Sequence, residues 1–393
     1  MRVWAGSIIS GTGDEITLLA LPWLVLQLTH SPFQLGIVAG LQHLPFLLFT
    51  LIAGVYADRW DRRRIMLGAD LLRFLSLATI PIAAIFGALT MVQIYLVAFL
   101  AGTGRVWFDV AHYALLPGIV ESEQLVEANG KFQMTDGVSV FFGPSIGGFL
   151  IKFAGAASAI AIDALSFLVS AAAIFTLPSL QAAQPPEERG WRAQLVGGLR
   201  YLVQQRPIFE NALALMAMLF FMTMVDAVFV FYAQHELQLD AALTGIVLGA
   251  AGLGPIVFGS LAPGVRRRFR TGQVMVTAAI LSGPLLAILD LAVLVPKPFA
   301  IALTGGSMAL SFGMAALWNV ATLSYRQAVI PGHLMSRVNS SLRFIGWGTM
   351  PIAAFVGGLL SQTIGVRWLI AISAVGLMLV GAGLATLSEI RRL

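Results

Sequence analysis

The sequence predicts an all-α integral membrane protein with twelve transmembrane helices in two six-helix bundles. Of its 393 residues, 58% are hydrophobic and 11% are charged, whereas soluble domains carry about 25% charged residues. The mean hydropathy is +0.86. The apolar runs reach the roughly 20 residues that a spanning helix needs and exceed the roughly 9–11 residues of a β-barrel strand. In addition, motifs in the first half of the chain recur in the second half.

Twelve apolar runs account for the transmembrane helices. The longest clearly polar stretch, 178–206, separates the first six runs from the last six. It is too short for a further soluble domain, which needs at least about 50 residues. We therefore expect an N-terminal bundle at 1–177, a cytoplasmic linker at 178–206 and a C-terminal bundle at 207–393. The expected spans are 4–28, 33–57, 65–88, 91–115, 130–153, 157–177, 208–233, 242–263, 272–295, 299–324, 338–363 and 367–388.

Lysine and arginine are distributed unevenly between the two sides of the predicted membrane. If the N-terminus is cytoplasmic, 18 of the 24 basic residues lie on the inner side, and three lie outside, namely Lys152, Lys297 and Arg367. Because cytoplasmic loops are enriched in positive charge, the sequence predicts that both termini are cytoplasmic. The basic excess is then explained by the anionic inner leaflet and not by nucleic acid.

The internal repeat relates equivalent helices of the two halves. The segment 54–64 has a counterpart at 259–268, where a second Gly-x-x-Ala run precedes three arginines. A second set of motif residues recurs after a constant offset of 210 residues: Asn129, Gly147-Gly148 and Gly155 return as Asn339, Gly357-Gly358 and Gly365. Two parallel halves around a central axis are typical of secondary transporters.

The polar linker contains one segment with apolar residues at helical spacing. After the helix breaker Pro185-Pro186, these residues are Trp191, Leu195, Leu199 and Leu202. The pattern predicts a short amphipathic helix on the inner leaflet. A plain tether without a regulatory role is the alternative.

Several function classes are excluded by what the sequence lacks. There are no cysteines, so disulfides, thiolate metal sites and cysteine nucleophiles are ruled out. The five histidines are scattered and form no His-Glu-x-x-His unit. No Gly-x-x-x-x-Gly-Lys-Ser/Thr phosphate-binding loop is present. We expect neither an enzyme nor a protein that binds a metal, a cofactor or nucleic acid.

Two motifs resemble signatures of the major facilitator superfamily. Residues 54–64, which read Gly-Val-Tyr-Ala-Asp-Arg-Trp-Asp-Arg-Arg-Arg, are similar to its loop between helices 2 and 3. Residues 143–148 are similar to the fifth-helix signature of its antiporters. The resemblance implies the major facilitator fold and transport by alternating access. Similarity to its drug exporter branch, with macrolide and enterobactin exporters, lies at 13–14, 70–73, 114–117 and 128–129.

The resemblance also implies gating roles. Asp58 would accept hydrogen bonds from the N-terminus of the eleventh helix near Asn339 and latch the outward-open state, although loop arginines that only set the orientation are the alternative. The helix-4 signature is partial, because Asp109 follows Arg105 where many relatives carry a small residue. The expected motif and gating residues are Gly54, Asp58, Arg59, Arg62, Arg63, Arg64, Arg73, Arg105, Gly143, Pro144, Gly147 and Gly148.

Small residues in two of these motifs predict close helix contacts. Gly54 would end its helix where backbones pass closely. Gly143 and Gly147, four residues apart, would allow tight packing beside a bend at Pro144. Simple packing and a seal against ion leak are both consistent with the fifth-helix motif.

Charged side chains inside the predicted spans cost free energy, so each is expected to have a structural or functional role. Several are expected in the inner half of the N-terminal bundle, where Arg105 and Asp109 are i,i+4 neighbours. Because carboxylates there outnumber arginines, at least one is expected to take up a proton. For Asp109, a permanently paired gate residue is the equal alternative. The expected proton-coupling residues are Asp109, Asp14, Asp136 and Asp70.

Position along each helix distinguishes the remaining acids. Asp14 lies ten residues beyond Trp4, about 15 Å into the membrane, and by resemblance faces the central cavity. Glu15 is rotated by about 100° and is expected to face a neighbouring helix. Asp226 and Asp290 lie nearer outer helix ends, where a solvated or headgroup-level position is expected.

Helices 7 and 10 are expected to supply an apolar, aromatic wall for a bulky cargo, although any one of their side chains is more often used for packing. Together with Asp14, the expected cargo-binding residues are Phe221, Met222, Trp318, Asn319 and Tyr325.

The composition and motifs predict a multi-pass protein of the cytoplasmic membrane that functions as a monomer in the lipid bilayer. The leading hypothesis is an exporter of amphipathic, drug-like small molecules that exchanges cargo for protons. Dedicated export of a natural product such as a siderophore, or transport of a lysolipid, is the alternative.

Overall fold

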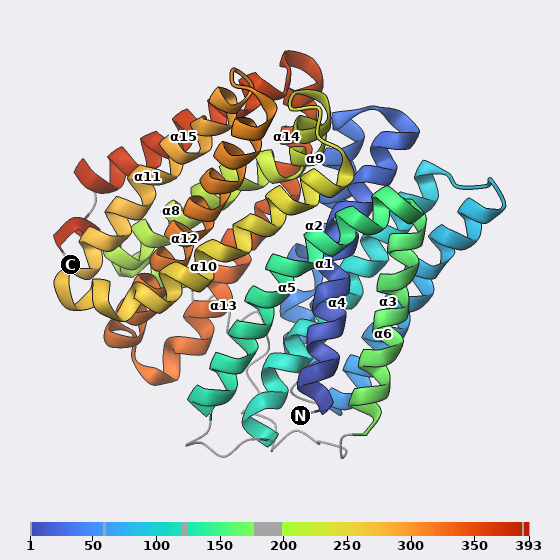
Figure 1. The fold of residues 1–393 in the computed structure, drawn as a ribbon. Helices are drawn as coiled ribbons and strands as arrows, with labels where there is room; N and C mark the ends of the chain where they lie inside the picture. Colours follow the sequence, from blue (N-terminus) through green and yellow to red (C-terminus); the bar gives the residue numbers. More distant parts are fainter. Residues whose placement is uncertain (1, 58–59, 120–124, 177–198, 387–388, 393) are drawn as a thin grey trace.

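A computed structural model describes residues 2–57, 60–119, 125–176, 199–386 and 389–392. Over these ranges the regular structure is helical, and twelve helical segments are long and apolar enough to cross a membrane. The prediction of an all-α protein with twelve spans is therefore confirmed. In Figure 1 the first six helices occupy one side of the molecule and the later helices the other.

The N-terminal bundle consists of six helices that each form one span. Ser31 caps the second helix, because its hydroxyl accepts a hydrogen bond of 3.4 Å from the Gln34 N–H. Asp61 caps the third in the same way, through a 3.0 Å bond from the Arg63 N–H. The helices are α1 (Arg2–Thr29), α2 (Pro32–Ala57), α3 (Arg62–Ile85), α4 (Met91–Ile119), α5 (Leu125–Ala154) and α6 (Ala156–Phe175).

The C-terminal bundle contains two interrupted spans. The seventh breaks after Asp226, and the eleventh breaks at Thr349, just before Pro351, which has no N–H for a helical hydrogen bond. Neither break was predicted. The elements are α8 (Arg206–Asp226), α9 (Phe229–His235), α10 (Ala241–Arg268), α11 (Thr271–Ala292), α12 (Lys297–Val329), α13 (Gly332–Gly348), α14 (Met350–Ile364), α15 (Val366–Thr386) and the 3₁₀ helix η2 (Glu389–Arg392).

Each bundle has its own buried apolar cluster, one formed mainly by α1–α6 and one by α8–α15. The bundles meet along α5 with α10 and along α2 with α14. In Figure 1, α5 and α10 run side by side between the two halves. The domain boundaries at 177/178 and 206/207 remain a prediction.

The internal repeat is visible in the contacts between the bundles. A methyl group on Gly245 of α10 would overlap the Pro144 carbonyl oxygen of α5. A methyl group on Gly36 of α2 would overlap the carbonyl oxygen of Ala354 of α14, which lies 210 residues after Pro144. Gly155 and Gly365, the glycines that follow α5 and α14, adopt positive φ angles of 85° and 95°. The constant offset in the sequence therefore reflects a two-fold arrangement of backbone contacts.

The loop between α2 and α3 lies partly outside the described residues, including Asp58 and Arg59. Gly54 does not match the prediction of a close backbone approach, since a methyl group there would meet no atom within 4 Å. α2 also continues past it to Ala57. Arg63 does link two helices, because its guanidinium donates a 2.5 Å hydrogen bond to the carbonyl of Phe175 at the end of α6.

The linker is described only from residue 199, so Trp191 and Leu195 lie outside the described residues. Residues 199–204 are helical. Leu202 is buried against the C-terminal bundle, in a cluster with Ile208 and Leu342. The expectation that Leu202 lies on the inner leaflet is therefore wrong, because it packs against protein.

Candidate functional site

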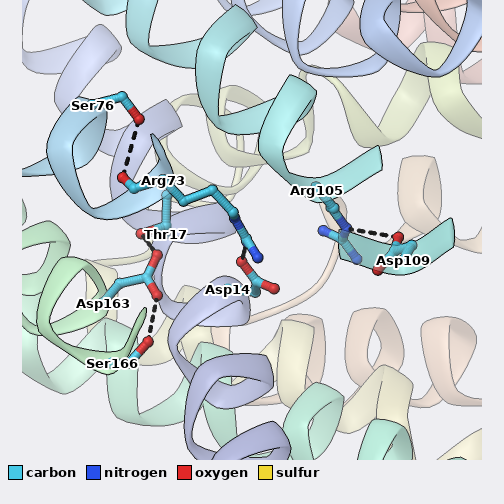
Figure 2. Close-up of polar contacts among 8 residues, drawn as sticks. All are labelled: Asp14, Thr17, Arg73, Ser76, Arg105, Asp109, Asp163 and Ser166. Carbon is cyan, nitrogen blue, oxygen red and sulfur yellow. Dashed lines mark hydrogen bonds and ion pairs between the residues drawn. The ribbon is translucent and has the colours of Figure 1, made fainter. Parts of the chain in front are cut away.

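Among the described residues, the most buried ion pair joins α1 to α3 near the middle of the N-terminal bundle. The Arg73 guanidinium of α3 donates a hydrogen bond to the Asp14 carboxylate of α1 (Figure 2). It also lies over the Phe167 ring of α6, 3.9 Å from the ring centroid. The Arg73 side chain is 6% exposed and that of Asp14 is 19% exposed. This arginine is therefore held by both charge and an aromatic face.

A second carboxylate completes this centre, and the sequence analysis missed it. Asp163 of α6 is fully buried. It accepts hydrogen bonds of 2.5 Å from Thr17 and 3.1 Å from Ser166, and it interacts electrostatically with Arg73 (Figure 2). The available signal was a lone aspartate in the apolar span expected at 157–177. We call Asp14, Arg73 and Asp163 the central ionic triad.

Two glycines make room for the central ionic triad. A side chain on Gly13 of α1 would overlap the Asp163 carboxylate and the Ser166 hydroxyl. A side chain on Gly104 of α4 would overlap the aliphatic stem of Arg73. One cation therefore serves two acids in a space that the neighbouring helices leave for them. Removing a single partner from such a buried group is costly.

Asp70 lies about one turn before Arg73 on α3 but does not pair with it. Its side chain is 1% exposed and lies beside α6, where Ser170 is its polar neighbour. Neither carboxylate oxygen completes a hydrogen bond to the described residues. A buried carboxylate without a cation is costly as an anion.

Arg105 and Asp109 of α4 form a separate, more accessible pair. Their charged atoms lie 3.9 Å apart, and their side chains are 42% and 36% exposed. Figure 2 places this pair apart from the central ionic triad, although Arg73 interacts electrostatically with both residues. The side chain of Asp136 lies outside what the structure describes. The inner acids thus form a buried centre and an exposed pair rather than one cluster.

The fifth-helix motif packs α5 against both bundles. A side chain on Gly143 would overlap Glu15 of α1, and one on Gly147 would press on Ile16. A side chain on Gly148 would overlap the start of α10. The predicted close packing is confirmed, as is the prediction that Glu15 faces a neighbouring helix. The motif therefore controls the distance between the bundles.

The predicted cargo residues have different surroundings. Trp318 is a correction: it is 2% exposed within the C-terminal apolar cluster, so it does not present a surface to cargo. Phe221 packs on α15, where its ring would overlap a side chain at Gly376. Met222 and Tyr325 are half-buried, and Asn319 is exposed.

At the helix ends that are predicted to face outward, two polar contacts join the bundles. Lys152 Nζ lies 2.8 Å from the Asp240 carboxylate, and Ser31 donates a 2.9 Å hydrogen bond to Gln362. Gln362 lies 210 residues after Lys152, and Asp240 caps α10 as Ser31 caps α2. Lys152, together with the Leu243 N–H, holds the pKa of Asp240 below its usual value. Equivalent residues of the repeat therefore join the bundles at the predicted outer side.

Comparison with known proteins identifies the family. The model of a family described as a transmembrane secretion effector, within the major facilitator superfamily, matches residues 1–392. The chain belongs to this family. Its members are transporters, and the resemblance inferred from the motifs is confirmed.

Three curated relatives of this chain are efflux proteins. The multidrug efflux pump Tap of Mycolicibacterium fortuitum is 29% identical, over 98% of this chain and 95% of the relative. Macrolide efflux protein A of Streptococcus pyogenes is 24% identical, over 100% and 96%. The enterobactin exporter EntS of Salmonella typhi is 26% identical, over 95% and 88%.

Solved structures support the fold of this chain. A bacterial homologue of the iron transporter ferroportin, in an inward-facing state, superposes with a TM-score of 0.79 at 17% identity, covering 99% of this chain and 98% of that one. At this identity the likeness concerns the fold. In the part of the chain that the structure describes, no group of three His, Asp or Glu residues is arranged to hold a metal ion.

The two contacts at the predicted outer side are expected to differ in their response to salt. Asp240→Asn keeps a residue that can cap α10 but removes the charge, and exposed ion pairs contribute about 0.2–1 kcal/mol. Ser31→Ala removes the uncharged contact. The thermal stability lost in Asp240→Asn should shrink as NaCl is raised, whereas the loss in Ser31→Ala should not. Lys152 and the Leu243 N–H lower the pKa of Asp240. The Lys152–Asp240 pair therefore stabilises the protein at neutral pH, and this stabilisation is lost only in acid, as the pH falls through the lowered pKa. Equal salt responses would contradict an ionic outer contact.

Proposed function

We propose that this membrane protein exports amphipathic small molecules in exchange for protons, by alternating access. Membership of the secretion effector family and three efflux relatives support the export of small molecules. The central ionic triad is the observation that carries the proposal of proton coupling. In our proposal the protein works as a monomer in the cytoplasmic membrane, with both termini in the cytoplasm.

Two acids compete for one arginine in the central ionic triad. Asp14 lies twelve residues into α1, or about 18 Å from its inner end. When Asp14 binds a proton it no longer needs Arg73, which then serves Asp163 alone. Because Asp14 is the more exposed of the two acids, it is the one proposed to exchange its proton with water. The order of protonation thereby changes the contacts between α1, α3 and α6.

The other predicted coupling residues have supporting roles in this proposal. Asp109 is partly exposed and lies on the neighbouring helix α4, so it is suited to pass protons between the inner solution and Asp14. Asp70 is buried behind the triad and would hold a proton permanently, since no cation among the described residues balances it. Asp136 remains a candidate on sequence grounds.

The repeat supports alternating access as the means of transport. In this proposal, the close glycine contacts and the two polar contacts Lys152–Asp240 and Ser31–Gln362 hold the outer side shut. A change to the outward-open state must separate these contacts and close the inner side instead. We propose that Asp58 then latches the inner side at the start of the eleventh span, as the loop motif implies.

Export of a dedicated natural product is the second candidate function. It is favoured by the relative named as an enterobactin exporter, whereas the relatives named for multidrug and macrolide efflux favour drug-like cargo. A lysolipid is the third cargo class in this proposal. A compound panel distinguishes the three, because a dedicated exporter moves one chemical class and a multidrug exporter moves several.

Substitution of Asp14 tests the coupling. We expect Asp14→Asn in proteoliposomes to reduce proton movement driven by cargo at least about tenfold, while cargo-for-cargo exchange continues, because exchange needs no net proton transfer. Asp109→Asn should slow proton movement without abolishing it. Asp290→Asn, at an outer pair with Arg367, is the matched control. An Asp14→Asn protein that retains wild-type proton movement would show that coupling lies elsewhere.

A further inference from the structure

The seventh span is broken at a charged residue. α8 ends at Asp226, and the N–H groups of Ala227 and Val228 bond to Thr223 and Val225 at 3.0 and 3.1 Å. Val228, with φ −118° and ψ 8°, departs from helical geometry before α9 begins. The carboxylate thus lies at the negative end of the α8 dipole, which favours a cation. In transporters, discontinuous spanning helices mark binding sites.

The break in the seventh span lies next to the other bundle. Val230, in the short helix α9 that follows the break, is buried in the apolar cluster of the N-terminal bundle with residues such as Leu19. α9 also contacts α1 directly. Asp226 precedes that contact by four residues, across the break, and is exposed. A ligand can therefore reach it at the point where the seventh span is broken. This exposure agrees with the solvated position that was expected.

Asp226 has no partner among the described residues. It forms no hydrogen bond or ion pair with them. Other acids of the C-terminal bundle are paired: Asp240 with Lys152, Asp290 with Arg367, and Glu210 with Arg206. An unpaired carboxylate inside a membrane span is expensive and marks a functional site. Unlike the buried Asp70, Asp226 is exposed, so a positively charged ligand can reach its carboxylate.

We propose that Asp226 binds the positive charge of the cargo and selects lipophilic organic cations. The half-buried apolar side chains of Met222 and Phe231, on the turns before and after it, suit the hydrophobic body of such a molecule. This assignment rests on the proposed export function. The assignment adds a cargo class to that function. It also places the cargo contact in the bundle opposite the central ionic triad, so the cation and the proton bind to separate acids.

A pair of probes of similar shape tests the assignment. Tetraphenylphosphonium carries a permanent positive charge, and triphenylphosphine oxide is neutral. Equilibrium binding of both is measured on the purified full-length protein in detergent, and their transport is measured in proteoliposomes. The variants are Asp226→Asn, Asp226→Glu, which keeps the charge, and the control Asp290→Asn, which removes a paired acid of the same bundle.

We expect Asp226→Asn to weaken binding of the cation at least about tenfold and binding of the neutral probe less than twofold. Asp226→Glu should restore most of the affinity. Equal losses for both probes, or no loss for the cation, would overturn the assignment. If the wild-type protein binds the probes but transports neither, the proposed export function is contradicted. The role of Asp226 is then still decided by how the variants bind the two probes.

Discussion

Replacing Arg73 with methionine is expected to destabilise the protein by about 3–5 kcal/mol. The substitution leaves Asp14 and Asp163 close to one another without their cation, and Asp163 is fully buried. It also removes the guanidinium from the Phe167 face. The change is measured by thermal unfolding of the purified protein in detergent, monitored as the loss of monodisperse protein.

A second substitution separates charge from packing. Arg73→Met combined with Asp163→Asn should recover part of the lost stability, because one buried charge is removed together with the cation. Arg73→Lys keeps the charge but cannot stack or form a fork of hydrogen bonds, so it should fall between wild type and Arg73→Met. Wild-type stability in Arg73→Met would mean that the two acids do not depend on this arginine, and the proposed coupling would fail with it.

The architecture was predictable because the bilayer imposes it. Long apolar runs must become helices in lipid, so the number of spans followed from hydropathy. The repeat at Gly147 and Gly357 predicted equivalent surfaces, and the structure places Gly147 against α1 and Gly357 against α8. Small residues are retained at such positions because backbones meet there. Motif spacing therefore carried information about contacts between helices as well as about the helices themselves.

The candidate site was less predictable, because the spacing of neighbouring residues in the sequence does not reveal contacts between residues on different helices. Arg105 and Asp109 were expected to pair since they are four residues apart, and they do. Arg73 instead crosses to Asp14, 59 positions away. Asp163 was overlooked because a single acid in an apolar run has no neighbour to indicate its role. The burial of Trp318 likewise depends on which side of α12 faces the core.

Replacing Gly245 with valine is expected to lower transport at least about tenfold by preventing closure of the outer side. A side chain at Gly245 meets the backbone of Pro144 and Gly148, which cannot rotate away as a side chain can. Overpacking usually costs about 1–3 kcal/mol, but here the strain is relieved by separating the bundles. The variant should therefore favour the outward-open state and accumulate there instead of failing to fold.

The chain has no native cysteine, so one introduced thiol reports this change without background. Val230→Cys is suitable, because Val230 is 5% exposed where the bundles meet. In the Gly245→Val background this thiol should react faster with an impermeant maleimide added from outside. Gly306→Val is the matched control, since a side chain there meets no atom within 4 Å.

The repeat sharpens this test. Gly36 stands in the same relation to Ala354 and Gly358 as Gly245 does to Pro144 and Gly148. Gly36→Val should therefore raise the reactivity of the Val230→Cys thiol as Gly245→Val does, although it lies in the other bundle. An effect at only one of the two positions would show that the contacts do not open together. Rigid-body rocking about the two-fold axis would then be the wrong description of how this transporter exposes its site.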